Sequence, residues 1–132
     1  MNQYHQFHLE LLKQPYNHLL SYSAFNSSDI NPQDQEFLDN FIELIEHCEN
    51  FTDQYMEKGQ QICLHWVRAY PDLVPVLPRD LIWFFGGDCL HYMPDEEINQ
   101  FQQLDELRYE AEANQQAFNY GEQRTVFFKL EK

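Results

Sequence analysis

Residues 31–49 read NPQDQEFLDNFIELIEHCE, and their spacing predicts one amphipathic helix. Asn31 is a typical N-cap residue, and Pro32 suits the first helical position. Beyond them an apolar stripe and an acidic stripe recur at helical spacing, centred roughly 160° apart at 100° per residue. The apolar positions are Phe37, Leu38, Phe41, Leu44, Ile45 and Cys48, and the acidic positions include Glu36, Asp39, Glu43 and Glu46. We therefore expect a surface helix that buries one stripe and exposes an acidic face.

The apolar pattern continues beyond this helix as far as Tyr70, where Pro71 follows. One unbroken helix of that length would exceed ~50 Å, which is too long for a compact domain of this size. We therefore expect a break near Asn50 or Gly59, which gives two helices. Three prolines in residues 71–78 predict an ordered connector instead of a helix.

The flanking segments also predict helices. A first helix should end near Lys13, with a second helical turn after Pro15 and a polar loop over residues 21–30. A short apolar helix should run over residues 78–85 and end at Gly86, followed by a compact loop over residues 87–93. A long helix should follow over residues 94–114, and the apolar tail should dock as a helix or a short strand. The expected fold is all-α, a single domain over residues 1–132 and a compact bundle of about five helices.

Composition excludes several classes of function. The chain has 132 residues and a formal net charge of −14, with 8 Lys and Arg against 22 Asp and Glu. This charge opposes phosphate backbones and anionic membrane surfaces, so we expect neither direct nucleic-acid binding nor membrane binding. Three Cys do not make a disulfide framework, and the first residues do not read as a signal peptide. We expect a soluble, cytoplasmic protein.

The acidic charge is concentrated in one part of the chain. No Lys or Arg lies between Lys13 and Lys58. A field of one sign attracts cationic partners, although a solvated helix face has the same composition. The leading hypothesis is a protein-interaction or regulatory module with a basic protein partner, which contacts Glu36, Asp39, Glu43 and Glu46. Homodimerisation stays open at this stage.

The densest set of reactive residue types lies in residues 86–97, GGDCLHYMPDEE. Adjacent glycines permit backbone conformations and close approaches that other residues do not make, and a helix start nearby favours an anion. The candidate binding residues are Gly86, Gly87, Asp88, Cys89, His91, Asp95 and Glu96. A purely structural interpretation explains the same residues, with glycines ending one helix, acids starting the next, and Cys and His packed between them.

This segment also carries the alternative function, a metal- or thiol-dependent site around Asp88, Cys89 and His91. Thiolate and imidazole are zinc ligands, but no Cys pair has the spacing of a zinc knuckle. Glycine-rich phosphate-binding fingerprints are absent from the sequence as well. We therefore assign no catalytic residue, no metal ligand set and no cofactor, and the sequence leans away from an enzyme.

Residues 83–103, WFFGGDCLHYMPDEEINQFQQ, resemble a family of small acidic bacterial proteins whose function is uncharacterised. The similarity extends from Tyr4 to about Gln116, and residues 83–103 are its distinctive part. The resemblance implies an ordered loop–helix element that matters to the family. It brings no catalytic residues to this chain.

Overall fold

The computed structural model describes residues 3–130, with side chains as far as Phe128. Within these residues the fold is all-α, as predicted, and contains no strand. The order along the chain is α1 (Gln3–Leu19), α2 (Ser23–Asn26), α3 (Pro32–Glu49), α4 (Tyr55–Ala69), η1 (Pro71–Val76), α5 (Arg79–Phe85), η2 (Gly87–Tyr92), α6 (Asp95–Ala113) and α7 (Tyr120–Leu130), where η marks a 3-10 helix. The expected number of about five helices is therefore too low, mainly because short 3-10 and α-helical turns occupy segments that read as loops.

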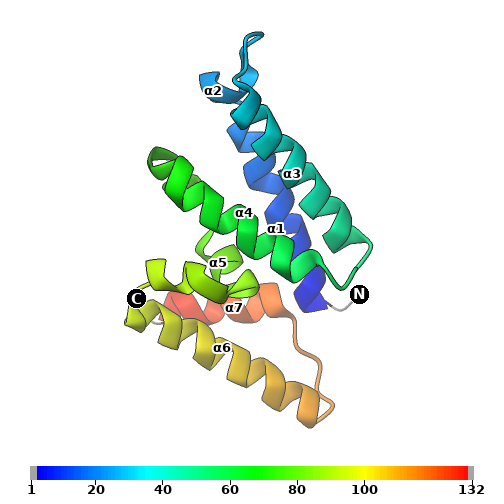
Figure 1. The fold of residues 1–132 in the computed structure, drawn as a ribbon. Coiled ribbons are helices and arrows are strands. Elements are labelled where there is room, and N and C mark those ends of the chain that lie inside the picture. The colour runs from blue at the N-terminus through cyan, green and yellow to red at the C-terminus, as the bar shows by residue number, and fades with distance from the viewer. Residues whose placement is uncertain (1–2, 131–132) are drawn as a thin grey trace.

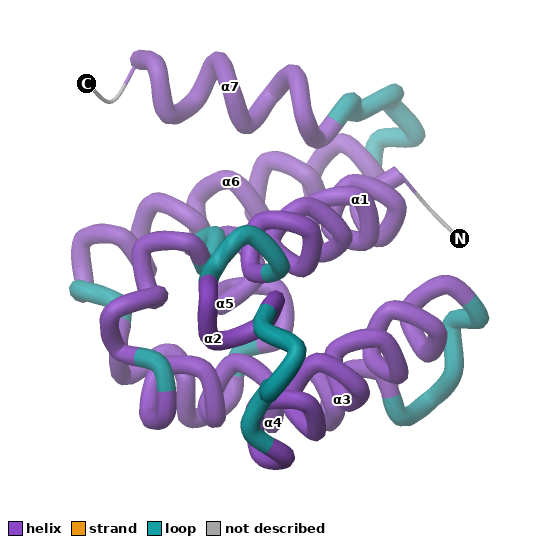
Figure 2. The backbone as a smooth tube through the Cα atoms, turned by 90° about the horizontal axis from the view of Figure 1, so that it is seen from above, coloured by secondary structure: helices purple, strands orange, loops and turns teal. Residues whose placement is uncertain are grey.

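The helices pack in two groups that share a core (Figure 1). Helix α3 packs against both α1 and α4, and α5 packs on α1 and α4 as well. Side chains of α5 form ion pairs with α6 and α7, and α7 also contacts α1 directly. Seen from above, α7 lies on the outside of the molecule, alongside α6 and α1 (Figure 2). None of the described helices is long and apolar enough to cross a membrane.

Helix α3 forms as the sequence predicts. The Asn31 side chain accepts a hydrogen bond from the backbone N–H of Gln33 at 2.8 Å, which satisfies one of the unpaired donors at the helix start. The apolar stripe is buried, apart from Ile45, which is half-buried. The helix ends at Glu49, so the break falls near Asn50 and the prediction of a break there is correct.

Two other expectations were wrong for reasons of tertiary packing. Helix α1 continues through Pro15 to Leu19, because Pro15 and Leu19 lie on the same buried face and their burial offsets the one backbone hydrogen bond that Pro15 cannot make. Residues 21–30 are not only a loop, since the short helix α2 buries Phe25 against Phe37 and Tyr70.

Three connections differ less from the prediction. Residues 71–76 and 87–92 are 3-10 helices, a conformation that suits short pieces between α-helices. Helix α5 ends at Gly86 as expected, while α6 begins at Asp95 with Pro94 at its N-cap. The tail forms helix α7, one of the two outcomes that the sequence left open.

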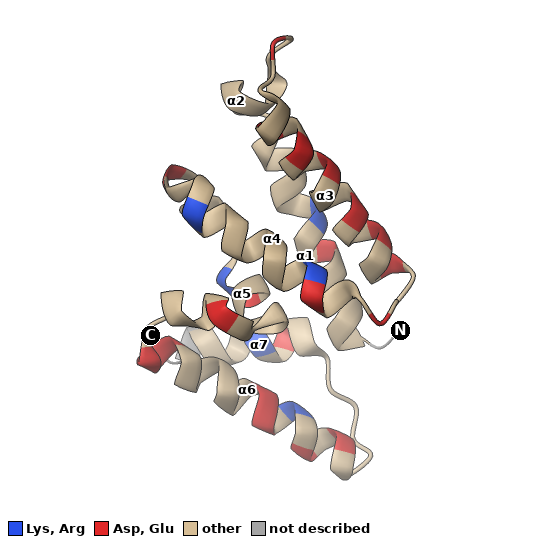
Figure 3. Cartoon of the chain, in the orientation of Figure 1, with Lys and Arg blue, Asp and Glu red and all other residues tan. Residues whose placement is uncertain are grey.

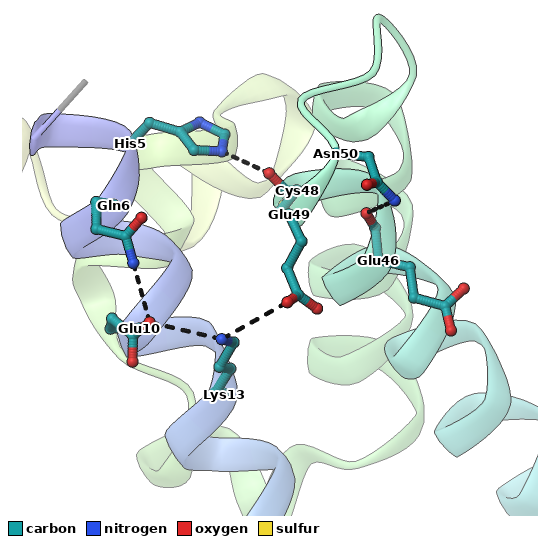
Figure 4. Close-up of polar contacts among 8 residues, drawn as sticks. All are labelled: His5, Gln6, Glu10, Lys13, Glu46, Cys48, Glu49 and Asn50. Carbon is teal, nitrogen blue, oxygen red and sulfur yellow. Dashed lines mark hydrogen bonds and ion pairs between the residues drawn. The ribbon is translucent and has the colours of Figure 1, made fainter. Parts of the chain in front are cut away.

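Polar contacts hold the start of α1 against the end of α3 (Figure 4). His5 Nε2 lies 2.8 Å from the carbonyl oxygen of Cys48. Lys13 Nζ lies 3.5 Å from Glu10 and 3.9 Å from Glu49, so its ammonium group bridges the two helices. These contacts fix the orientation of α3, and with it the direction of the acidic face.

Candidate functional site

The two glycines of residues 86–97 allow α5 and η2 to approach α4 closely. Gly86 and Gly87 have φ of 67° and 72°, values that favour glycine. A Cβ on Gly87 would lie 2.9 Å from Cδ of Gln60, a residue of α4. The Gln60 side chain donates a 2.8 Å hydrogen bond to the carbonyl of Phe85. The geometry therefore assigns the glycine pair a role in joining these helices.

Cys89 points into this same junction and is only 1% exposed. Its thiol lies 3.8 Å from the carbonyl oxygen of Gln60 and contacts the buried thiol of Cys63. The contact between the two thiols and the burial of Cys63 raise the pKa of Cys63 well above its usual range. The same contact lowers the pKa of Cys89, whereas the burial of Cys89 and the Asp88 carboxylate oppose this.

The remaining candidates of this segment do not join Cys89 in the core. The exposed ones are Asp88, His91, Asp95 and Glu96. Across the described residues there is no group of three or more His, Cys, Asp or Glu side chains arranged to hold a metal ion. A metal- or thiol-dependent site at Asp88, Cys89 and His91 stays a prediction, and the structure separates its thiol from solvent.

The four acidic candidates of α3 lie on the surface. Glu36, Asp39, Glu43 and Glu46 are all exposed. Figure 3 shows acidic residues following one side of α3 along its length, with few basic residues near them. Helix α3 therefore has the acidic face that its sequence predicts, and its other face is buried against α1 and α4.

A groove of about 640 Å³ runs between α3 and α4 and brings two of these four carboxylates together with other groups. Its lining combines acids, amides and apolar side chains. The lining residues are Gln33, Asp34, Glu36, Phe37, Asn40, Glu43, Lys58, Gln61, Ile62, His65, Ala69 and Tyr70. This acidic groove, defined by these residues, was not predicted, because the α4 side of it depends on how α4 packs on α3.

Interactions within the acidic groove set the charge along it. Lys58 Nζ lies 3.0 Å from Glu43 and lowers the pKa of that carboxyl by a hydrogen bond and by its charge. The Tyr70 hydroxyl donates a 2.5 Å hydrogen bond to Asp34, and burial together with this carboxylate raises the pKa of Tyr70. Glu36 forms no ion pair within the described part of the chain. The groove therefore has a neutralised end at Lys58 and a free negative charge at Glu36.

A second polar cluster, which the sequence does not predict, lies in the core. It contains five buried polar or charged side chains: His8, Asp80, Asp105, Arg108 and Tyr120. Arg124 forms an ion pair with Asp80, and Trp83 donates a 2.8 Å hydrogen bond to Asp105. No local pattern indicates this cluster, because its members come from four helices that are far apart in the sequence.

Fold and groove together define a small all-α protein with an acidic surface groove. The chain belongs to the PA2817-like family, whose family model matches residues 1–132. Comparison with curated proteins and with solved structures finds no match. The predicted membership in an uncharacterised family is thus confirmed, while the idea that residues 83–103 mark the family stays a prediction.

Proposed function

We propose that this protein is an interaction module that binds a basic segment of a protein partner in its acidic groove. The main observation behind the proposal is the groove of about 640 Å³ between α3 and α4, because it gathers several carboxylates along one hollow. Asp34, Glu36 and Glu43 supply its negative charge, while Phe37 and Ile62 line its floor and are themselves almost fully buried. A segment whose Lys or Arg side chains reach these carboxylates matches this lining.

The charge of the whole chain supports a cationic partner. A net charge of −14 accelerates the encounter with basic proteins and repels acidic ones. Within the groove, Glu36 is the carboxylate best suited to a partner's cation, since Glu43 already pairs with Lys58 and Asp34 accepts from Tyr70. We further propose that the module is a single domain and acts in the cytoplasm.

The test begins with the partner that copurifies from the protein's own cells. The affinity of that purified partner is then measured for the wild type and two charge-matched double variants. The groove variant is Glu36→Lys with Glu43→Lys, and the control is Glu106→Lys with Glu110→Lys on the exposed side of α6. Both variants change the net charge equally. Because Glu43→Lys also removes the ion pair with Lys58, urea unfolding of both variants must show equal stability before a difference in affinity is assigned to the position of the charges.

We expect the groove variant to weaken binding by about tenfold or more and to flatten its dependence on salt. The control should lose affinity only through the reduced negative charge of the whole protein, an effect that about 0.15 M salt screens beyond ~8 Å. Equal affinities of the two variants would reject the acidic groove as the binding surface.

A further inference from the structure

Two buried cysteines from distant parts of the sequence meet where η2 packs on α4. Cys63 lies on α4 and is 2% exposed, and Cys89 lies on η2 and is 1% exposed. The two thiols contact each other, and the Cys89 thiol also donates to the carbonyl oxygen of Gln60 at 3.8 Å. Gln60 and Cys63 are three residues apart on α4, so Cys89 is seated against a single turn of that helix.

Backbone contacts on the α5 side fix the position of Cys89. The Gln60 side chain donates a 2.8 Å hydrogen bond to the carbonyl of Phe85, just before the glycine pair. A Cβ on Gly87 would lie 2.9 Å from Cδ of Gln60, so a side chain there would push η2 away from α4. The close approach of the two thiols is therefore set by the backbone of η2 and not by the rotamer of a surface side chain.

The two thiols of the pair are not equivalent. The Cys63 thiol donates to the Cys89 sulfur, and this contact lowers the pKa of Cys89 and raises that of Cys63 well above its usual range. The positive charge of Arg68 lowers the pKa of Cys89 further, against the burial of Cys89 and the Asp88 carboxylate. Because the thiolate is the nucleophilic form of cysteine, Cys89 is the residue that reacts first and Cys63 is its protonated neighbour.

The η2 segment is built to open locally. Cys89 is the one buried residue of η2, whereas Gly87, Asp88, His91 and Tyr92 are exposed. Short 3-10 helices have weaker hydrogen-bond geometry than α-helices, and elements with few buried contacts open at low cost in free energy. Opening of η2 therefore brings Cys89 to solvent while α4 stays folded.

We propose that Cys63 and Cys89 are a reversible redox pair, which a small hydroperoxide converts into a disulfide and a dithiol reductant restores. Disulfides in a reducing compartment are usually transient and redox-sensing, which agrees with a pair that is buried and reduced at rest. The link would pin η2, and with it the start of α6, to α4. The redox pair is separate from the acidic groove and does not depend on the function proposed for it.

The oxidation takes two steps. The Cys89 thiolate attacks one oxygen of hydrogen peroxide, the O–O bond breaks, and the second oxygen leaves as water after taking up a proton, so that Cys89 becomes a sulfenic acid. The Cys63 sulfur then attacks Sγ of Cys89, the S–O bond breaks, and the hydroxide leaves as water with the proton of Cys63. Two thiols thus lose two electrons to one peroxide and yield one disulfide and two waters.

The third cysteine supplies an internal reference. Cys48 lies on α3 and is 1% exposed, as deeply buried as Cys89. Burial raises its pKa to about 12, and its thiol contacts neither Cys63 nor Cys89 in the described part of the chain. Cys48 therefore shares the burial of the pair but lacks a neighbouring thiol, so it reports how fast an unpaired buried cysteine is oxidised.

The test is oxidation of the full-length native protein by hydrogen peroxide, followed by alkylation in denaturant and digestion without reduction. Mass spectrometry should find a peptide in which Cys63 is linked to Cys89, with the loss of about 2 Da that a disulfide requires. The link should form about tenfold or more faster than Cys48 is oxidised, because contact makes the second step intramolecular. Dithiothreitol should restore both thiols, and Cys48→Ser should form the same link.

The fold and not the sequence should determine this pairing. In urea, loop closure favours the shorter loop between Cys48 and Cys63, so the 63–89 link should no longer dominate there. In Cys63→Ser, Cys89 should stop as a sulfenic acid, which dimedone captures; the pairing of the wild-type thiols decides the question even if this variant does not fold. Oxidation of Cys48 before the pair is linked, or a 63–89 link that forms only in urea, would overturn the proposal.

Discussion

Replacing Gly59 by alanine should destabilise this protein, although the same change stabilises most helices. Gly59 lies inside α4, where glycine costs about 1 kcal/mol relative to alanine. On local grounds Gly59→Ala is therefore favourable. The structure reverses the sign, because a Cβ at this position would stand 2.5 Å from Cγ of Phe85 and closer still to Cδ1 and Cε1 of the same ring.

The magnitude follows from the confinement of Phe85. Its ring is only 2% exposed and is held by the ring of Phe84, whose centroid is 5.0 Å away. Carbon atoms at rest lie about 3.5–4.0 Å apart, so the closest ring atoms or α4 must retreat by about 1.5 Å or more. Overpacking of this kind costs about 1–3 kcal/mol. If overpacking costs about 3 kcal/mol and the higher helix propensity of alanine returns about 1 kcal/mol, the free energy of unfolding should fall by about 2 kcal/mol.

Urea unfolding followed by circular dichroism measures this loss, and Gly121→Ala is the matched control. At Gly121 a new Cβ would be 3.4 Å from Cδ2 of Phe7, which is an ordinary contact, so the control should be neutral or stabilised by up to about 1 kcal/mol. In thermal unfolding the Gly59→Ala loss corresponds to a drop of about 8 °C for a chain of this length. A Gly59→Ala variant as stable as the wild type would show that Phe85 does not confine this position.

Three further predictions concern buried groups. Arg124→Ala should cost about 3 kcal/mol, more than Asp80→Ala, because it leaves the buried Asp80 carboxylate, 4% exposed, without its partner, whereas the Arg124 side chain is 32% exposed. The urea midpoint of Arg124→Ala should therefore be the lower of the two, and the opposite order would contradict this prediction. Burial lowers the pKa of His8 to about 4, so between about pH 6.5 and pH 4 the unfolded chain binds a proton that the folded chain does not bind. The free energy of unfolding should therefore fall by about 3 kcal/mol as the pH falls over this range. His8→Leu should flatten this dependence of stability on pH, and an unchanged dependence would disprove the prediction. The three cysteines, Cys48, Cys63 and Cys89, are buried, and burial raises the pKa of Cys48 to about 12. All three should react slowly with a thiol reagent in the native protein and promptly in denaturant. Fast labelling of Cys89 alone in the native protein would instead favour the thiol-dependent site.

Much of the fold follows from patterns within single helices. The cap at Asn31, the buried stripe of α3 and the end of α5 at Gly86 depend on neighbours in the sequence, and the structure agrees with each prediction. Pro15 and Gly59 lie inside helices despite their low helix propensity, because contacts with residues distant in the sequence outweigh that propensity. Pro15 stays helical through burial of its own face, and Gly59 makes room for Phe85 instead of ending a helix.

Among the candidate sites, too, the features set by neighbours in the sequence were predictable, and those set by tertiary packing were not. The exposed acids of α3 were predictable, since helical spacing alone separates them from the apolar stripe. Spacing alone, however, did not reveal that Cys89 turns inward to Cys63 while His91 faces solvent. The cluster that joins Asp80 to Arg124 was equally hidden, because it depends on where α7 docks.

The most direct test of the acidic groove is a map of the partner's contact surface on the isotope-labelled protein by NMR chemical-shift perturbation. The measurement uses the partner captured from the protein's own cells. If the acidic groove is the binding surface, the largest perturbations cluster between α3 and α4, around Glu36, Gln61 and His65. Perturbations that instead centre on residues 86–97, with the groove unaffected, would contradict it.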